Sequence, residues 1–176
     1  MNITLDDVAC LVHISVDGRL IQEDDLDHDH GVDLLVTHLL FLVEEAAEQV
    51  TNNSGAFVTY TALKERYEHL LNRCNHLLGE DLSEEELSRI RPACVKAILL
   101  LLLGYTLFVG KNNKTINLVW MLAIQNLDDI GTWSWGGMRL AFLYEQLNLT
   151  SNSLVGAIGG YMTLLVVIYI FLIFLS

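Results

Sequence analysis

The stretch that decides the fold of this chain reads Gly131-Thr132-Trp133-Ser134-Trp135-Gly136-Gly137-Met138-Arg139-Leu140-Ala141-Phe142-Leu143-Tyr144. It places two of the three tryptophans beside a pair of glycines. After the glycines, apolar residues recur at positions 140, 143, 144 and 147, which is the spacing of a helix with one buried face. We therefore expect a helix here, with Trp133 and Trp135 at its start and with both rings serving the packing of the core.

The composition favours a mainly α fold. The chain has 176 residues, one proline and 52% hydrophobic residues, which suits one domain with a substantial core. We expect a single α-helical domain over residues 1–176, with short hairpin or turn elements and an apolar C-terminal helix. Cys10, Cys74 and Cys94 lie far apart without a CxxC spacing, so we expect reduced thiols in the core rather than disulfides or a zinc site.

Negative charge is concentrated in the first half of the chain. The net charge is −12, and residues 1–90 hold 19 acidic against five basic residues. This field repels the phosphate backbone of nucleic acids, so we expect no direct nucleic-acid binding. The beginning of the chain has the pattern of a helix-turn-helix, but the acidic segment 22–30 stands where a recognition helix would have to meet DNA.

Capping signals and apolar periodicity predict the other elements. Thr4 and Asp7 have the spacing of a capping box, and Asp17-Gly18 is typical of a hairpin or a tight turn. Further helices are expected over residues 32–50, 60–78, 97–109 and 119–127. One more begins after Ser83, and Pro92 can restart or kink it. The uncharged stretch 154–175 is long enough to cross a membrane, whereas 97–109 is too short and should be a buried core helix.

Metal-binding side chains cluster in the acidic segment 23–33. Its candidate ligands are Asp27, His28, Asp29, His30 and Asp33. Adjacent ligands without a rigid element or a distant partner do not fix a coordination geometry. We therefore expect a solvated acidic loop and no metal site.

The sequence contains no recognisable catalytic or cofactor-binding constellation. The lysines at positions 64, 96, 111 and 114 stand outside any cofactor-lysine context, and no glycine-rich phosphate cup accompanies them. His69, Cys74 and His76 share one predicted helix, but the cysteine belongs to its apolar face and the histidines to the edges of that face. We expect neither an enzyme nor a bound cofactor.

Four stretches, taken in order, resemble the plant mobile domain. They are 3–9 with the turn 16–19, then 55–64 and 91–100, then 103–108 with the tryptophan stretch, and finally 159–165. The matching positions are Asp17, Gly18, Gly104, Leu107, Phe108, Trp133, Trp135, Gly136, Leu140, Leu143, Tyr144, Gly159 and Gly160. The resemblance covers residues 3–165, whereas 166–176 departs from the family pattern, as in a truncated or altered copy.

The resemblance implies a nuclear, non-catalytic protein-interaction module linked to transposon silencing and meristem maintenance. It also implies type-7 serine/threonine phosphatase-like proteins as partners, and a truncated copy could be a non-functional fragment. The label "aminotransferase-like" that the family often carries finds no support in these residues. The alternative is a tail-anchored membrane protein with an acidic cytosolic helical domain, in which Gly156 and Gly160 of the inserted stretch 154–175 form a small-residue contact face. Against that alternative, no basic residues flank this stretch on its N-terminal side.

Overall fold

The computed structural model describes residues 4–22, 26–52, 55–77, 84–110 and 114–151. Within them the chain is mainly α-helical, as predicted. The elements in chain order are α1 (Leu5–Val12), α2 (His28–Leu39), α3 (Val43–Asn52), β1 (Phe57–Thr59), α4 (Tyr60–Leu77), α5 (Glu84–Leu102), a π-helical segment (Leu103–Leu107), β2 (Thr115–Asn117), a 3₁₀ turn (Leu118–Trp120), α6 (Met121–Ile124), a second 3₁₀ segment (Leu127–Thr132) and α7 (Trp135–Ser151). The predicted helix 154–175, with Gly159 and Gly160, lies outside the described residues.

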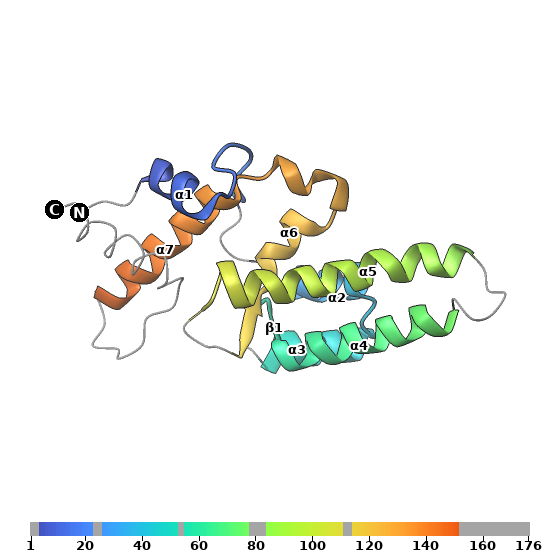
Figure 1. Cartoon of the computed structure of the whole chain (residues 1–176). Coiled ribbons are helices and arrows are strands. Elements are labelled where there is room, and N and C mark those ends of the chain that lie inside the picture. Colours follow the sequence, from blue (N-terminus) through green and yellow to red (C-terminus); the bar gives the residue numbers. More distant parts are fainter. Residues whose placement is uncertain (1–3, 23–25, 53–54, 78–83, 111–113, 152–176) are drawn as a thin grey trace.

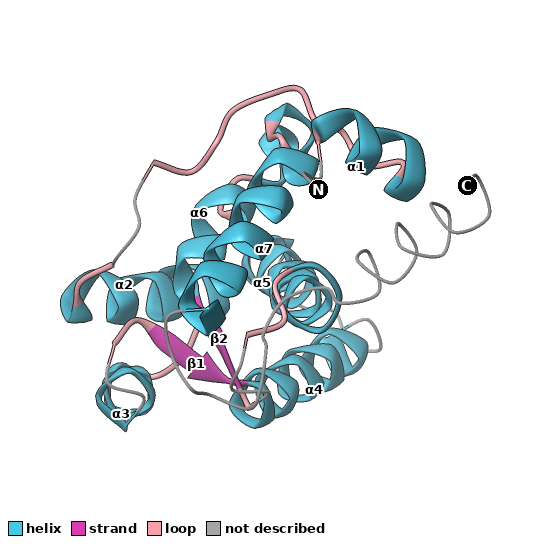
Figure 2. Ribbon diagram, turned by 90° about the vertical axis from the view of Figure 1, so that its left-hand side faces the viewer, coloured by secondary structure: helices cyan, strands magenta, loops and turns pink. Residues whose placement is uncertain are grey.

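The two longest helices of the described chain, α4 and α5, pack side by side in opposite directions (Figure 1). A short antiparallel sheet lies at one end of this pair (Figure 2). Val58 of β1 pairs with Ile116 of β2, and both side chains are buried. The sequence did not predict this sheet, because three residues per strand are too few to show an alternation of apolar and polar positions.

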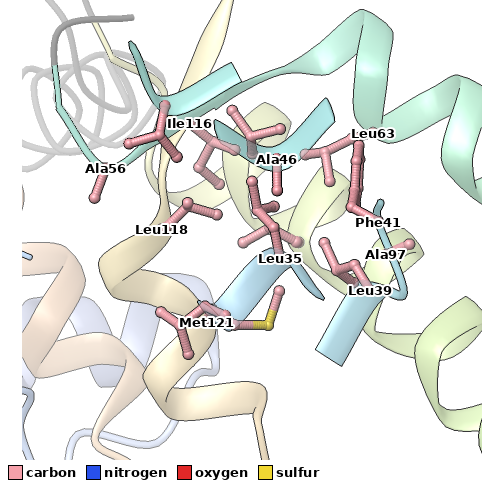
Figure 3. Close-up of a cluster of buried hydrophobic side chains, with 14 of the residues drawn as sticks. Leu35, Leu39, Phe41, Ala46, Ala56, Leu63, Ala97, Ile116, Leu118 and Met121 are labelled. Carbon is pink, nitrogen blue, oxygen red and sulfur yellow. The ribbon is translucent and has the colours of Figure 1, made fainter. Parts of the chain in front are cut away.

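The main core lies where α2, α3, α4 and α5 meet (Figure 3). Leu35 and Leu39 come from α2, Ala46 from α3, Leu63 from α4 and Ala97 from α5, and all five side chains are fully buried. Burying a leucine side chain stabilises a fold by about 1.5–3 kcal/mol. The long helices and the α2–α3 pair are therefore held together mainly by this cluster.

Helices α1 and α7 pack against each other as a second group (Figure 1). The predicted capping box at the start of α1 is confirmed. The backbone N–H of Asp7 donates to Thr4 Oγ1, and the backbone N–H of Thr4 donates to Asp7 Oδ2 at 2.8 Å. The Thr4 hydroxyl also donates to Asp7 Oδ2 (2.8 Å), and the hydrogen bonds that the carboxylate receives from the backbone N–H and then from the hydroxyl of Thr4 lower the pKa of Asp7. Val8 is fully buried, whereas Leu5 at the beginning of the same helix is 45% exposed.

The single helix predicted over residues 32–50 is wrong, because the chain forms α2 and α3 with a break between them. Leu40 adopts the left-handed conformation (φ 57°) and ends α2. Leu42 and Val43, which follow the break, are 61% and 62% exposed. α2 also begins earlier than predicted, at His28, so part of the expected acidic loop is helical.

The region around α5 also differs from the prediction. The helix runs through Pro92 and continues as the π-helical segment to Leu107. It contributes Ala97 and Leu100 to the core, but Leu102 is 51% exposed, so this region is not buried on every side. The predicted helix 119–127 consists of a 3₁₀ turn and the single turn of α6.

The stretch Glu84–Leu107 is long and apolar enough to cross a membrane by length and composition alone. A core helix of a globular domain has the same properties, and this one packs against α2 and α4. All three cysteines are free. Cys74 and Cys94 are half-buried, but Cys10 is exposed, so the prediction of a core thiol is wrong for Cys10.

Candidate functional site

The tryptophan stretch opens α7, and the N-terminal segment docks onto it. The backbone N–H of Gly136 donates to Ser15 O (2.7 Å), and the buried Ser134 hydroxyl donates to Val16 O. A Cβ atom on Gly136 would lie 2.9 Å from Val16 Cγ1 and 3.0 Å from Ser15 O. A side chain at this position would force Val16 or the Ser15 backbone to move, so the close approach of the two segments favours glycine.

The predicted Asp17-Gly18 turn is present, but it does not form a hairpin. Gly18 has φ +127°, and a Cβ atom there would lie 2.5 Å from Thr132 O. The next residue pairs with the tryptophan stretch in a parallel bridge. Arg19 N donates to Thr132 O (2.9 Å), and Ser134 N donates to Arg19 O (2.8 Å). The turn therefore joins two segments that are far apart in the sequence.

The side chain of Arg19 covers the first tryptophan. Its guanidinium carbon lies 4.4 Å from the centroid of the Trp133 ring, and its Nη2 donates to Thr132 Oγ1 (2.6 Å). Asp129 lies 3.8 Å from the same group. A hydrogen bond fixes the second tryptophan, because Trp135 Nε1 donates to Ile130 O (2.9 Å). Both rings are half-buried, and both contact groups of this chain.

The buried face of α7 agrees with the prediction in part. Leu140 and Leu143 are 8% and 1% exposed, but Tyr144 is 36% exposed and lies at the edge of the helix. Arg139 is buried to the same degree as its apolar neighbours, with 2% exposure. No pattern in the sequence indicated this burial, because an arginine beside one apolar face is ordinarily solvated.

The stretch 103–108, which reads Leu-Gly-Tyr-Thr-Leu-Phe, connects the core with α7. Gly104 is buried, and a Cβ atom there would lie 2.6 Å from the Tyr60 ring. Tyr60 stacks on Tyr105 with a centroid distance of 4.4 Å, and burial, with a smaller effect of Tyr105, raises the pKa of Tyr60 to about 12. Phe108 stacks on Trp120 and meets Phe142 of α7 edge to face. Leu107 is half-buried within this segment.

The candidate metal ligands have separate roles in the structure. Asp27 caps α2 by accepting from His30 N (2.7 Å), and His28 Nε2 lies 3.1 Å from Thr51 Oγ1. Asp33 accepts a hydrogen bond from the Thr37 hydroxyl, one turn along the helix. Among the residues that the structure describes, no three His, Cys, Asp or Glu side chains gather as a metal site.

One lysine lies in an unusual environment. Lys96 Nζ of α5 is 3.2 Å from His38 Nδ1 of α2. Burial lowers the pKa of Lys96, and burial followed by the charge of Lys96 lowers the pKa of His38. Asp33 acts in the opposite direction on His38. The contact joins two core helices.

Comparison with known proteins identifies the family. The profile described as "Plant mobile domain" matches residues 1–171. The chain belongs to the plant mobile domain family. The match includes residues 166–171, which lie beyond the point where we expected the resemblance to end.

Three Arabidopsis thaliana proteins are similar to this plant mobile domain over 94% of its length. They are "Protein MAIN-LIKE 2" (29% identical), "Protein MAINTENANCE OF MERISTEMS" (28%) and "Protein MAIN-LIKE 1" (27%). The chain spans 22%, 31% and 30% of their respective lengths. No solved structure matches.

The structure brings together several stretches that carry the family resemblance. Gly18 and Gly136 lie on the two sides of one backbone contact, while Gly104 and Phe108 lie where the core meets α7. These residues of the plant mobile domain contact other parts of the same chain. Their immediate role in the geometry is to build the fold.

Proposed function

We propose that this chain is a non-catalytic protein-interaction module of the kind found in proteins that maintain meristems. The observation that carries the proposal is the way the tryptophan stretch is used. Ser134 and Gly136 direct their polar groups to the N-terminal segment, and Arg19 lies over Trp133. A catalytic stretch would direct such groups toward a substrate.

The setting of this module comes from the family. The name of one relative, "Protein MAINTENANCE OF MERISTEMS", supports a role in meristem development. We extend this to a nuclear location, to a link with transposon silencing, and to type-7 serine/threonine phosphatase-like proteins as partners. The acidic first half of the chain supports protein partners over direct contact with nucleic acid.

Cell fractionation with a tagged copy of the chain tests this proposal. We expect the protein in the nuclear soluble fraction, where it should co-purify with a type-7 phosphatase-like protein, and a tagged helical protein without this domain is the control. Recovery only in a carbonate-resistant membrane fraction would support the alternative, a tail-anchored protein held by the uncharged stretch 154–175.

The non-catalytic part of the proposal has its own test. Among the lysines that the structure describes, Lys96 has the lowered pKa that would best suit cofactor chemistry. Adding pyridoxal phosphate should leave an absorption spectrum that is the same for the unchanged chain and for Lys96→Arg. A change in the spectrum that depends on Lys96 would overturn the non-catalytic proposal.

A further inference from the structure

A groove lies between α3, α4 and the beginning of α5. Its volume is about 720 Å³. Its floor includes Phe41, Leu70 and Ile90, which are 7%, 2% and 3% exposed. One face of α4 forms a wall from Ala62 to Arg73, a length of roughly 17 Å at the rise of an α-helix. The groove is therefore about three helical turns long.

Exposed apolar side chains extend the floor of the groove outward. Leu42 lines the groove and is 61% exposed, and Val43 beside it is 62% exposed. The left-handed Leu40 ends α2 and turns the chain at this point. Adjacent exposed large apolar residues next to a groove are typical of a protein-interaction site.

The charges along the groove are unequally balanced. Arg73 pairs with Glu86. Arg66 donates to Leu39 O (2.9 Å), its guanidinium carbon lies 5.3 Å from the centroid of the Phe41 ring, and its charge interacts with that of Glu45. At the α3 end, Glu48 and Glu65 also line the groove, and neither makes an ion pair within the described residues. Glu45, beside them, receives one long contact, from Leu42 N at 3.4 Å. Among the lining residues of α3 and of α4 up to Arg66, the three carboxylates of Glu45, Glu48 and Glu65 stand against the one guanidinium of Arg66, so this end carries an excess of negative charge.

We propose that the groove binds a basic amphipathic helix of a partner protein. Apolar side chains spaced one turn apart would pack on Phe41 and Leu42, and lysines or arginines on the flanking positions would face Glu48 and Glu65. A helix fits because its ridges can pack between α3 and α4, and because helix-in-groove recognition combines an apolar stripe with charged edges. This inference rests on the proposed function as an interaction module and names the surface and the kind of partner.

Synthetic helical peptides test the inference on the full 176-residue chain. One peptide has leucine at every third or fourth position and lysine at its edges, a second replaces lysine by glutamate, and a third scrambles the first. We expect the basic peptide to bind with NMR shifts at Leu42, Glu48 and Glu65, and to weaken with added salt because the charge contacts are exposed. The acidic and scrambled peptides should bind at least about tenfold more weakly.

Matched variants locate the contact. The double variant Glu48→Lys, Glu65→Lys should weaken the basic peptide about tenfold, whereas Glu44→Lys, a change on the same helix outside the groove lining, should not. Leu42→Ser should weaken binding, whereas Leu71→Ser, exposed on α4 outside the lining, should not. Circular dichroism verifies that each variant folds.

Three outcomes of the peptide and oligomer measurements would overturn the groove proposal. They are equal binding of the acidic or scrambled peptide, equal weakening with Glu44→Lys, and a dimer of the unchanged chain that Leu42→Ser converts to a monomer. The last would mean that a second copy occupies the groove. If the groove variants still co-purify with the phosphatase-like partner, the proposal that the groove is the docking site is refuted, while the proposal that the chain is an interaction module is retained. If the unchanged chain does not co-purify, the proposed function fails independently.

Discussion

Replacing Gly18 by alanine should detach the N-terminal segment from the tryptophan stretch. Gly18 has φ +127°, and the new Cβ atom would meet Thr132 O at 2.5 Å. A non-glycine residue in such a conformation costs about 1–3 kcal/mol. The clash adds a further cost. Thr132 O cannot move away from the new Cβ atom without disturbing the hydrogen bond that it accepts from Arg19 N.

Four of the hydrogen bonds that detachment breaks give the scale of the effect. These bonds join Arg19 N to Thr132 O, Ser134 N to Arg19 O, Gly136 N to Ser15 O and Ser134 Oγ to Val16 O. At about 0.5–1.5 kcal/mol each, they contribute roughly 2–6 kcal/mol together. We expect Gly18→Ala to lower the free energy of unfolding by about 2–3 kcal/mol, because opening this contact limits the strain that the chain retains.

Denaturant unfolding and amide hydrogen exchange measure this effect. The exchange of Arg19, Ser134 and Gly136 N–H should accelerate in Gly18→Ala, while core amides in α2 change only in proportion to the global stability. Gly131→Ala is the matched control, because a Cβ atom at Gly131 meets nothing within 4 Å. The reasoning is refuted if the two variants have the same stability and the same exchange at these three amides.

Four further predictions concern other features. Gly104→Ala should lower the free energy of unfolding by about 1–3 kcal/mol, since its Cβ atom would overlap the Tyr60 ring; chemical denaturation measures it, and no change would mean that the ring shifts freely. Trp135→Phe should cost about 1 kcal/mol because the variant lacks the indole N–H donor, and an unchanged denaturation midpoint would show that this hydrogen bond contributes nothing. Hydrogen bonds from Thr4 lower the pKa of Asp7, so the ionised carboxylate stabilises the fold at pH values above the pKa of Asp7 in the unfolded chain. This contribution disappears as the pH falls below about 4. Asp7→Asn should therefore flatten the acid limb of the curve of unfolding free energy against pH. Titration of duplex DNA at physiological salt should stay flat, and a salt-sensitive shift would contradict the charge argument.

Local signals in the sequence predicted local structure well. The spacing of Thr4 and Asp7 identified the start of α1, and the periodicity from Tyr60 onward predicted α4 almost to the residue. Capping and apolar periodicity depend on neighbours within one or two turns, so one sequence contains all that is needed to recognise them. The Asp-Gly turn was recognisable for the same reason.

Features that depend on distant parts of the chain could not be predicted. The break at Leu40 is in a residue with good helix propensity, and it is fixed by the packing of α2 and α3 rather than by a glycine or proline. The burial of Arg139 and the pairing of Arg19 with Trp133 also arise from tertiary contacts. For the candidate site, the sequence indicated the relevant residues but not that they meet one another.

The bridge between Arg19 and Trp133 also sets an order of events during synthesis. The partners Arg19 and Thr132 are 113 residues apart. At 5–20 residues per second, the ribosome completes the second segment roughly 6–23 s after the first. Closure of so long a loop is entropically unfavourable until the intervening helices have condensed. Of these two segments, the one translated earlier is therefore among the last parts of the domain to reach its native contacts, and until then the nascent chain exposes Val8 and its neighbours to chaperones.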